Sequence, residues 1–106
     1  MSDDTRIFMD YQGRKIRLNT ERLSHLLEHP EMVGQLHRIE ETLANPQIII
    51  STSLDDSVHV YHRYYEITPV TSKYLQVVVK LLIDDAFILT AFFSNRQKRG
   101  DMVWQA

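Results

Sequence analysis

The chain has 106 residues, 43% of them hydrophobic, and a formal net charge of −2 from 12 Lys and Arg against 14 Asp and Glu. That size suits one domain, residues 1–106, with a real hydrophobic core. The near-neutral charge argues against bulk positive charge as the means of holding nucleic acid, though not against a local basic patch. Cysteine is absent, which excludes disulfides and thiolate metal sites. The acidic N-terminus lacks a signal-peptide pattern and no apolar run approaches the roughly 20 residues of a membrane span, so we expect a soluble, cytoplasmic protein.

The first half of the chain predicts a short hairpin followed by two helices. Residues 5–18 alternate weakly between apolar and polar side chains around a glycine-containing turn, which is typical of a hairpin. Asn19 can cap a helix that runs to about residue 28 or 29, because Pro30 restricts the residue before it. Pro30 can in turn open a second helix, whose apolar residues recur at helical spacing until residue 45.

The second half of the chain predicts strands. Apolar and β-branched residues are concentrated in four segments separated by polar turns: residues 47–52, 58–65, 73–83 and 86–93. The Asp84–Asp85 pair is a two-residue hairpin turn. Together these elements predict an α+β domain in which a short N-terminal hairpin and two helices pack on a four-stranded antiparallel meander. The basic tail after residue 93 is read as polar and solvated, with Trp104 packing over the core or at an oligomer contact.

The end of the first predicted helix carries the densest group of titratable side chains. His25, Glu28, His29 and Glu31 fall within seven residues, and positions 25 and 29 project from the same face of a helix. An ordinary imidazole pKa of about 6.5 suits both a general base and a general acid. The alternatives are two solvated residues on a helix exterior, or a metal pair. The second lacks the glutamate directly after the first histidine that a zinc-protease motif needs, so we expect no metal.

Alternation along the later strands predicts two different faces of the sheet. Apolar sets are taken from the two longest strands: Leu75, Val77, Val79 and Leu81, and Phe87, Leu89, Ala91 and Phe93. The helices are expected to cover this apolar face. The open face then collects cations, phenols, an amide and a hydroxyl: His59, Tyr61, Arg63, Tyr65, Gln76, Lys80 and Thr90. Such a surface suits a phosphodiester.

RNA cleavage without a metal needs a base for the 2′-hydroxyl, an acid for the leaving 5′-oxygen and donors for the charge on phosphorus. The histidine pair can do the first two tasks, while Arg63 can bind phosphate oxygens bidentately and Lys80 can supply a point charge. Tyr61 or Tyr65 could stack on a base. Each of these residues also has a structural alternative, since tyrosine and threonine are common in strands and cations are common on solvated faces. The run from Arg96 to Arg99 is either a solvated tail or a nucleic-acid contact.

Several segments together resemble the phage barnase–EndoU–colicin–RelE-like nucleases, a superfamily of small metal-independent RNases found in toxins and phage. The matching stretches start at His25, Ile39, Val58, Tyr74 and Ile88, within a region of about residues 14–104. The resemblance implies a two-helix, four-strand fold and cleavage through the 2′-hydroxyl without a cofactor. It also implies a helical histidine (His25 or His29), a strand cation (Arg63 or Lys80) and Thr90 as functional positions.

The sequence thus predicts two sets of site residues for a metal-independent endoribonuclease. The catalytic set is His25, His29, Arg63, Lys80 and Thr90. The substrate-binding set is His59, Tyr61, Tyr65, Gln76, Arg96 and Lys98. The expected partners are single-stranded RNA or tRNA, a protein inhibitor and a second copy of the chain, with no membrane. The alternative is a catalytically inactive RNA- or protein-binding domain of the same fold, which uses the open sheet face and dimerises through it.

Overall fold

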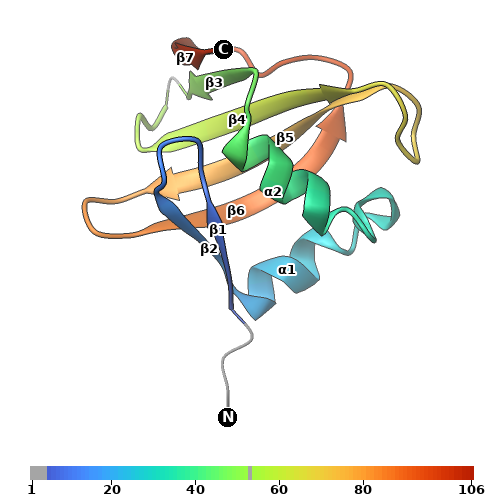
Figure 1. The fold of residues 1–106 in the computed structure, drawn as a ribbon, viewed down its shortest axis with the longest axis horizontal. Coiled ribbons are helices and arrows are strands. Elements are labelled where there is room, and N and C mark those ends of the chain that lie inside the picture. The colour runs from blue at the N-terminus through green and yellow to red at the C-terminus, as the bar shows by residue number, and fades with distance from the viewer. Residues whose placement is uncertain (1–4, 53) are drawn as a thin grey trace.

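The computed structural model describes residues 5–52 and 54–106. Within them the chain forms two α-helices, one short 3-10 helix and seven strands of a single mixed sheet (Figure 1). In chain order the elements are β1 (Arg6–Met9), β2 (Lys15–Leu18), α1 (Thr20–Leu26), the 3-10 helix η1 (Pro30–Met32), α2 (Leu36–Ala44), β3 (Ile48–Ser51), β4 (Val58–Tyr65), β5 (Lys73–Leu81), β6 (Ala86–Ser94) and β7 (Asp101–Gln105). The predicted α+β class is confirmed.

The predicted meander forms the middle of a wider sheet, whose strand order is β1-β2-β6-β5-β4-β3-β7. Strands β3 to β6 pair antiparallel with their neighbours in the chain. The N-terminal hairpin extends one edge because β2 runs parallel to β6, and β7 extends the other edge because it pairs with β3. The predicted sheet is too small because β7 is short and follows a polar, basic stretch that is typical of a tail.

Both helices are shorter than the apolar periodicity predicts. The Asn19 side chain accepts a hydrogen bond from a backbone N–H in the first turn of α1 at 2.8 Å, but the helix ends at Leu26. The predicted second helix is divided into η1 and α2, since Gly34 between them has a φ of +79°, which glycine adopts far more readily than other residues. His29 therefore lies in the connection after α1, and the prediction that it shares a helix face with His25 is wrong.

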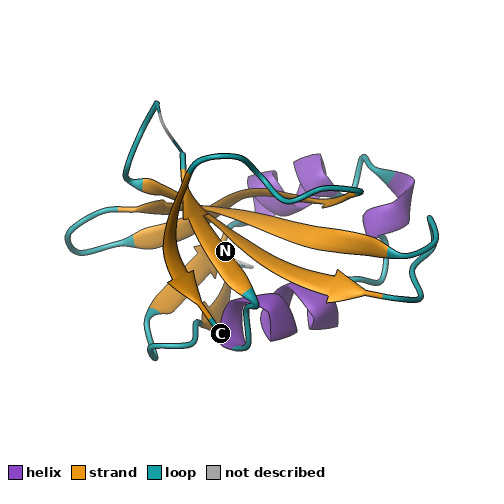
Figure 2. Cartoon of the chain, turned by 90° about the horizontal axis from the view of Figure 1, so that it is seen from above, coloured by secondary structure: helices purple, strands orange, loops and turns teal. Residues whose placement is uncertain are grey.

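One hydrophobic core lies between the helices and one face of the sheet, whose strands fan out when seen from above (Figure 2). α1 packs on β6, and α2 packs across β1, β4 and β5. Both layers supply buried apolar side chains: Leu26, Met32, Ile39 and Leu43 from the helical segments, and Ile49, Tyr61, Leu75, Val77, Val79, Ile88 and Ala91 among those from the sheet. Trp104 of β7 packs against this core, in agreement with one of its two predicted roles. We call this side of the sheet the helix-side face and the opposite side the outer face.

The register of β4 against β5 decides which side chains share a face. Tyr61 lies directly opposite Val77, and Arg63 lies directly opposite Leu75, and both β5 residues belong to the core. β4 therefore presents these side chains to the helix-side face: His59, Tyr61, Arg63 and Tyr65. The predicted open face, which combines them with Gln76, Lys80 and Thr90 of the neighbouring strands, is wrong.

A β-bulge in β6 changes the face of its side chains halfway along the strand. Leu89 is the extra residue, because Thr90 pairs with Val78 whereas Ile88 pairs with Val79. Ile88 is consequently a core residue, although simple alternation assigns it to the outer face. The predicted apolar set of this strand (Phe87, Leu89, Ala91 and Phe93) holds only after the bulge, where Ala91 and Phe93 contribute to the core.

Candidate functional site

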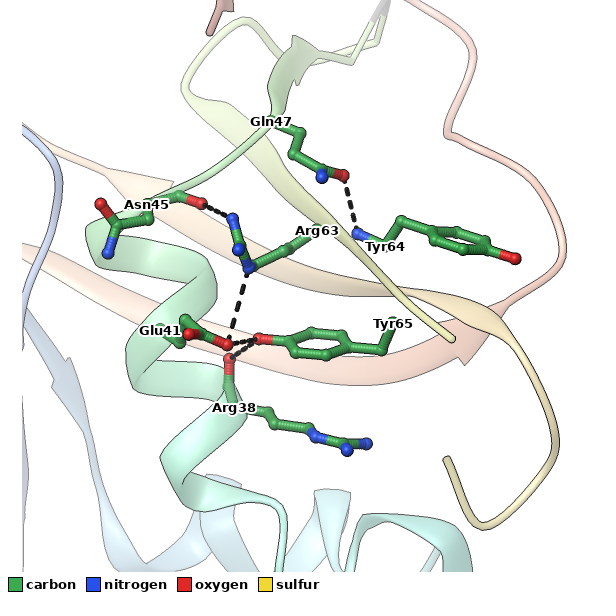
Figure 3. A network of polar contacts seen from close by, with 7 residues as sticks. All are labelled: Arg38, Glu41, Asn45, Gln47, Arg63, Tyr64 and Tyr65. Carbon is green, nitrogen blue, oxygen red and sulfur yellow. Dashed lines mark hydrogen bonds and ion pairs between the residues drawn. The ribbon is translucent and has the colours of Figure 1, made fainter. Parts of the chain in front are cut away.

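Four polar side chains meet where α2 packs against the end of β4 (Figure 3). We call Arg38, Glu41, Arg63 and Tyr65 the Arg63 cluster. The Tyr65 hydroxyl donates to Glu41 Oε1 at 2.6 Å, and Arg63 Nε lies 3.6 Å from the same oxygen. The Arg38 guanidinium lies over the Tyr65 ring, 4.6 Å from its centroid. The Glu41 carboxylate is thus held by a phenol and one guanidinium group, while the second guanidinium group packs on the phenol ring.

The local structure explains why these residues converge. Arg38 and Glu41 are three positions apart on α2 and so share a helix face, while Arg63 and Tyr65 are two apart on β4 and share a strand face. Arg63 Nη1 also donates to the backbone carbonyl of Asn45 at 2.8 Å, just after the last residue of α2. Because carbonyls at a helix end lack partners inside the helix, this bond joins the end of α2 to β4.

The electrostatics of the cluster keep the phenol of Tyr65 neutral. Burial, and then the hydrogen bond to Glu41, raise the pKa of Tyr65 to about 12, so its hydroxyl remains a donor at neutral pH. Arg38 Nη1 and Arg63 Nε are buried without a hydrogen-bond partner among the described residues. Buried guanidinium N–H groups without acceptors are unusual, and they are suited to oxygen atoms of an anion.

A groove of about 440 Å³ lies beside the cluster, between α2 and β1. Glu41 and Asn45 form one part of its wall, and the remaining lining residues are Ile7, Met9, His37, Glu40 and Ala44. His37 precedes Glu41 by one helical turn, so an exposed imidazole and the clustered carboxylate line the same groove. The groove thus brings a carboxylate and an imidazole, groups that can act as general base and general acid, to one space, and Glu41 is the member of the Arg63 cluster that lines it.

The two histidines of the predicted catalytic set do not enter the Arg63 cluster. His25 and His29 have 61% and 57% of their side chains exposed, and each lies near one glutamate: His25 Nε2 is 4.0 Å from Glu21 Oε1, and His29 Nδ1 is 3.9 Å from Glu31 Oε1. Neither imidazole forms a hydrogen bond with the sheet in the part of the chain that the structure describes. Both belong to the helical layer, on the same side of the sheet as Arg63.

Lys80 and Thr90 lie on the outer face, so the sheet separates them from Arg63. Lys80 Nζ donates to Asp55 Oδ2 at 2.6 Å, and this bond holds the pKa of the Asp55 carboxyl well below its usual range. The five predicted catalytic residues therefore do not form one site. They divide into a helix-side group and an outer-face pair.

Tyr61 and His59, two predicted substrate-binding residues, occupy positions that serve the fold. The Tyr61 hydroxyl donates to Asp10 Oδ2 at 2.8 Å, and burial raises the pKa of the Tyr61 phenol. With its ring enclosed in the core, Tyr61 has no face for a base, so its predicted stacking role is wrong. His59 is half-buried, and burial followed by the nearby Arg14 charge lowers its pKa.

The outer face is not open, because the connection from β6 to β7 crosses it. We call residues 95–100 the strap. Gln76 Nε2 donates to the backbone carbonyl of Arg96 at 2.7 Å, and the Lys98 N–H donates to His62 Nε2 at 2.9 Å. Gln76 thus binds the chain itself, whereas the side chains of Arg96 and Lys98 are exposed.

Sequence reasoning missed Arg38, His37 and Glu41 as site residues. Their i, i+3 and i, i+4 spacing on α2 indicates that the three side chains lie close together on the polar side of the helix. The spacing does not indicate which strand the helix packs against. Among residues 5–52 and 54–106, no group of three or more His, Cys, Asp or Glu side chains converges as a metal site requires. No described helix is both long and apolar enough to cross a membrane.

Comparison with known proteins agrees with the resemblance seen in the sequence. Residues 1–105 match the family described as phage-Barnase-EndoU-ColicinE5/D-RelE like nuclease2. No curated protein and no solved structure matches the chain.

Proposed function

Because the chain belongs to the phage-Barnase-EndoU-ColicinE5/D-RelE like nuclease family, we propose that it is a metal-independent endoribonuclease whose reaction centre is the Arg63 cluster and its groove. One observation carries the assignment of the site. The Glu41 carboxylate is fixed by Tyr65 and Arg63 at the wall of a groove that also contains the His37 imidazole. No comparable group of acid, base and cations is found on the outer face of the described residues.

The groups present account for each step of cleavage. Glu41 takes the proton of the 2′-hydroxyl, and the 2′-oxygen forms a bond to phosphorus. The bond from phosphorus to the 5′-oxygen breaks, and that oxygen takes a proton from the His37 imidazolium. The guanidinium groups of Arg38 and Arg63 donate to the phosphoryl oxygens as negative charge develops on them. The products are a 2′,3′-cyclic phosphate and a 5′-hydroxyl.

The predicted histidines remain in the proposal as a second source of the acid. His25 and His29 are exposed in the helical layer, on the side of the sheet that carries Arg63. Lys80 and Thr90, on the other face, are assigned to substrate contact. A separate candidate is a catalytically inactive RNA-binding domain, which is favoured by the exposed cations of the strap.

The test is incubation of the purified chain with 5′-labelled single-stranded RNA in EDTA. Glu41→Gln should lower the cleavage rate by about 10²–10⁴-fold, the usual contribution of a general base. Glu40→Gln is the matched control, since this neighbouring carboxylate lines the groove without contacting Arg63 or Tyr65. We expect it to change the rate less than about twofold, as for a residue outside the proton transfer. Thermal unfolding of each variant checks that it is folded.

Companion variants locate the acid and the face. His37→Gln and the double variant His25→Ala/His29→Ala are compared in the same assay. The variant with the slower cleavage identifies the acid, because the histidine replaced in it supplies the proton. Loss of cleavage in Lys80→Met and Thr90→Val, with Glu41→Gln active, would move the reaction centre to the outer face. A folded wild-type protein that leaves RNA intact would contradict nuclease activity and favour the binding domain.

A further inference from the structure

The backbone of the strap is fixed to the outer face by two buried polar side chains. His62 is fully buried and Gln76 nearly so, and the two lie directly opposite each other on β4 and β5. His62 Nε2 accepts from the Lys98 N–H, so the imidazole proton is on Nδ1, which lies 3.3 Å from the Ile48 carbonyl oxygen. A segment that the sequence marks as a solvated tail is therefore held in one conformation.

The end of the strap is equally constrained. Gly100 has a φ of +150°, and a Cβ at this position would overlap the Ser51 carbonyl oxygen and lie 2.8 Å from Ile50 Cγ2. Only glycine fits this close approach to β3. The strap is thus anchored over β5, β4 and β3 in succession, which orders its backbone before any ligand binds.

The strap carries three positive charges and no negative one. Arg96, Lys98 and Arg99 are exposed, and their side chains have no hydrogen bond or ion pair with the described residues. Two cations in the central strands have acidic partners instead, Lys80 with Asp55 and Arg63 with Glu41. In a chain of net charge −2, this is a concentrated, uncompensated positive patch on a rigid backbone.

An aromatic pair adjoins this patch. Tyr64 of β4 and Tyr74 of β5 lie directly opposite each other on the outer face, with ring centroids 5.1 Å apart. Along these two strands they are the next outer-face pair after His62 and Gln76. Tyr64 is 41% exposed. Lys73 donates to the side chain of Asn95, which connects this end of β5 to the start of the strap.

We infer that the strap and the Tyr64–Tyr74 pair form a binding surface for single-stranded RNA. Phosphates bind to Arg96, Lys98 and Arg99, and a base stacks on the exposed tyrosine rings, the combination that single-stranded nucleic-acid binders use. An acidic peptide would satisfy the cations but would leave the rings without a planar partner, which favours the nucleic acid. The identity of the nucleic acid as RNA rests on the proposed function.

The position of this surface relates it to the Arg63 cluster. Tyr64 lies between Arg63 and Tyr65 on β4, and Figure 3 shows the Tyr64 and Tyr65 rings pointing in opposite directions. β3 pairs with β4 only as far as His62, so residues 63–65 form an end of β4 that β3 does not flank. An RNA strand bound on the outer face therefore needs only to pass around this end of β4 to reach the cluster. The surface would hold nucleotides that flank the one being cleaved.

The test is fluorescence anisotropy with a labelled 2′-O-methyl oligouridylate, which cannot be cleaved because it has no free 2′-hydroxyl. We expect Arg96→Gln/Lys98→Gln/Arg99→Gln to weaken binding at least tenfold. The slope of log K against log salt should become shallower by about 2, since each single-strand phosphate contact contributes about 0.7. The matched control is Arg6→Gln/Lys15→Gln/Arg22→Gln, which removes three exposed cations from other elements. It should retain most of the affinity.

The aromatic half of the surface is tested with Tyr64→Ala/Tyr74→Ala, expected to weaken binding about tenfold. Equal weakening by both triple variants, or no binding of the wild type in low salt, would overturn the proposal. So would oligoglutamate that displaces the RNA equally well from the wild type and from the tyrosine variant. Because the probe resists cleavage, binding without cleavage of ordinary RNA contradicts only the reaction centre. Cleavage that survives the strap and tyrosine variants contradicts only this surface.

Discussion

β4 separates two polar regions that are built in different ways. On the helix-side face, Arg63 and Tyr65 contact Glu41, so side chain binds side chain and the charge of Arg63 is compensated by a carboxylate. On the outer face, His62 and its neighbour Gln76 bind the backbone of the strap and leave its cationic side chains free. Compensated groups in fixed positions suit chemistry on a bound phosphate. Uncompensated cations on a fixed backbone suit attraction of a charged chain.

The two regions should also contribute differently to the stability of the fold. The Arg63 cluster is partly exposed, so water and salt weaken its ion pair, whereas the anchors of the strap are shielded in the sheet. Substitutions in the strap anchors should therefore affect stability more than substitutions in the cluster. Three experiments test that ranking.

The largest effect is expected for Gly100→Ala, because the new methyl group meets β3 backbone at a strained φ. We expect the free energy of unfolding to fall by roughly 2–4 kcal/mol, since strain and overpacking each typically cost 1–3 kcal/mol. Urea unfolding of this variant and of Gly13→Ala provides the comparison. Gly13 has a φ of +81° but open space around it, so its variant carries strain alone. Equal losses in the two variants would show that the close contact has no energetic role.

A smaller, pH-dependent effect is expected at His62. Burial lowers the pKa of this imidazole below its unfolded value of about 6.5, so its stabilising contribution is complete above that pH and is lost as the pH falls. Protonation of His62 Nε2 would also replace the acceptor of the Lys98 N–H with an N–H group, so two donors would face each other. His62→Gln should cost about 1–3 kcal/mol at pH 7.5, as for a disturbed buried hydrogen bond, and should flatten the loss of stability on the acid side.

Thermal unfolding between pH 7.5 and pH 5 measures this difference. His59→Gln is the control, because burial also lowers the pKa of His59 but no strap bond depends on it. An unchanged acid-side loss in His62→Gln would show that protonation of His62 is not its cause.

The smallest effect is expected for the ion pair of the cluster. A double-mutant cycle of Arg63→Met and Glu41→Gln should give a coupling energy of about 0.5 kcal/mol, the usual value for partly exposed pairs. Chemical denaturation of the wild type, both single variants and the double variant supplies the four free energies. A coupling energy larger than the free energy of unfolding lost in His62→Gln would reverse the ranking of the two faces.

Local sequence signals predicted the strands well. The limits of β4 match the predicted segment 58–65, and β6 differs from its prediction by one residue. The orientation of β4 was not predictable from alternation, because each of its two residue sets mixes polar and apolar side chains, and only the register against β5 distinguishes them. Likewise, the bulge at Leu89 exchanges the faces of β6 without any glycine or proline to mark it.

The candidate site was less predictable than the fold, for a related reason. Arg38 and Glu41 come from a helix, Arg63 and Tyr65 come from a strand, and only the packing of α2 on β4 brings them together. Lys80 and Arg63 are both strand cations in the sequence, yet the register places them on opposite faces. The RNA target, a protein inhibitor, a homodimer and a cytoplasmic location stay predictions.

The parallel contact between β2 and β6 has a consequence for the order of folding. Meander strands pair with neighbours along the chain, whereas the Arg17–Asp85 bond beside the β2–β6 contact joins residues 68 positions apart. Closing so long a loop costs more chain entropy than forming a local hairpin, and it is therefore slower. We therefore expect the meander to form first and the N-terminal hairpin to dock last. Pulse-labelled hydrogen exchange would reveal this as late protection of the β2 amides.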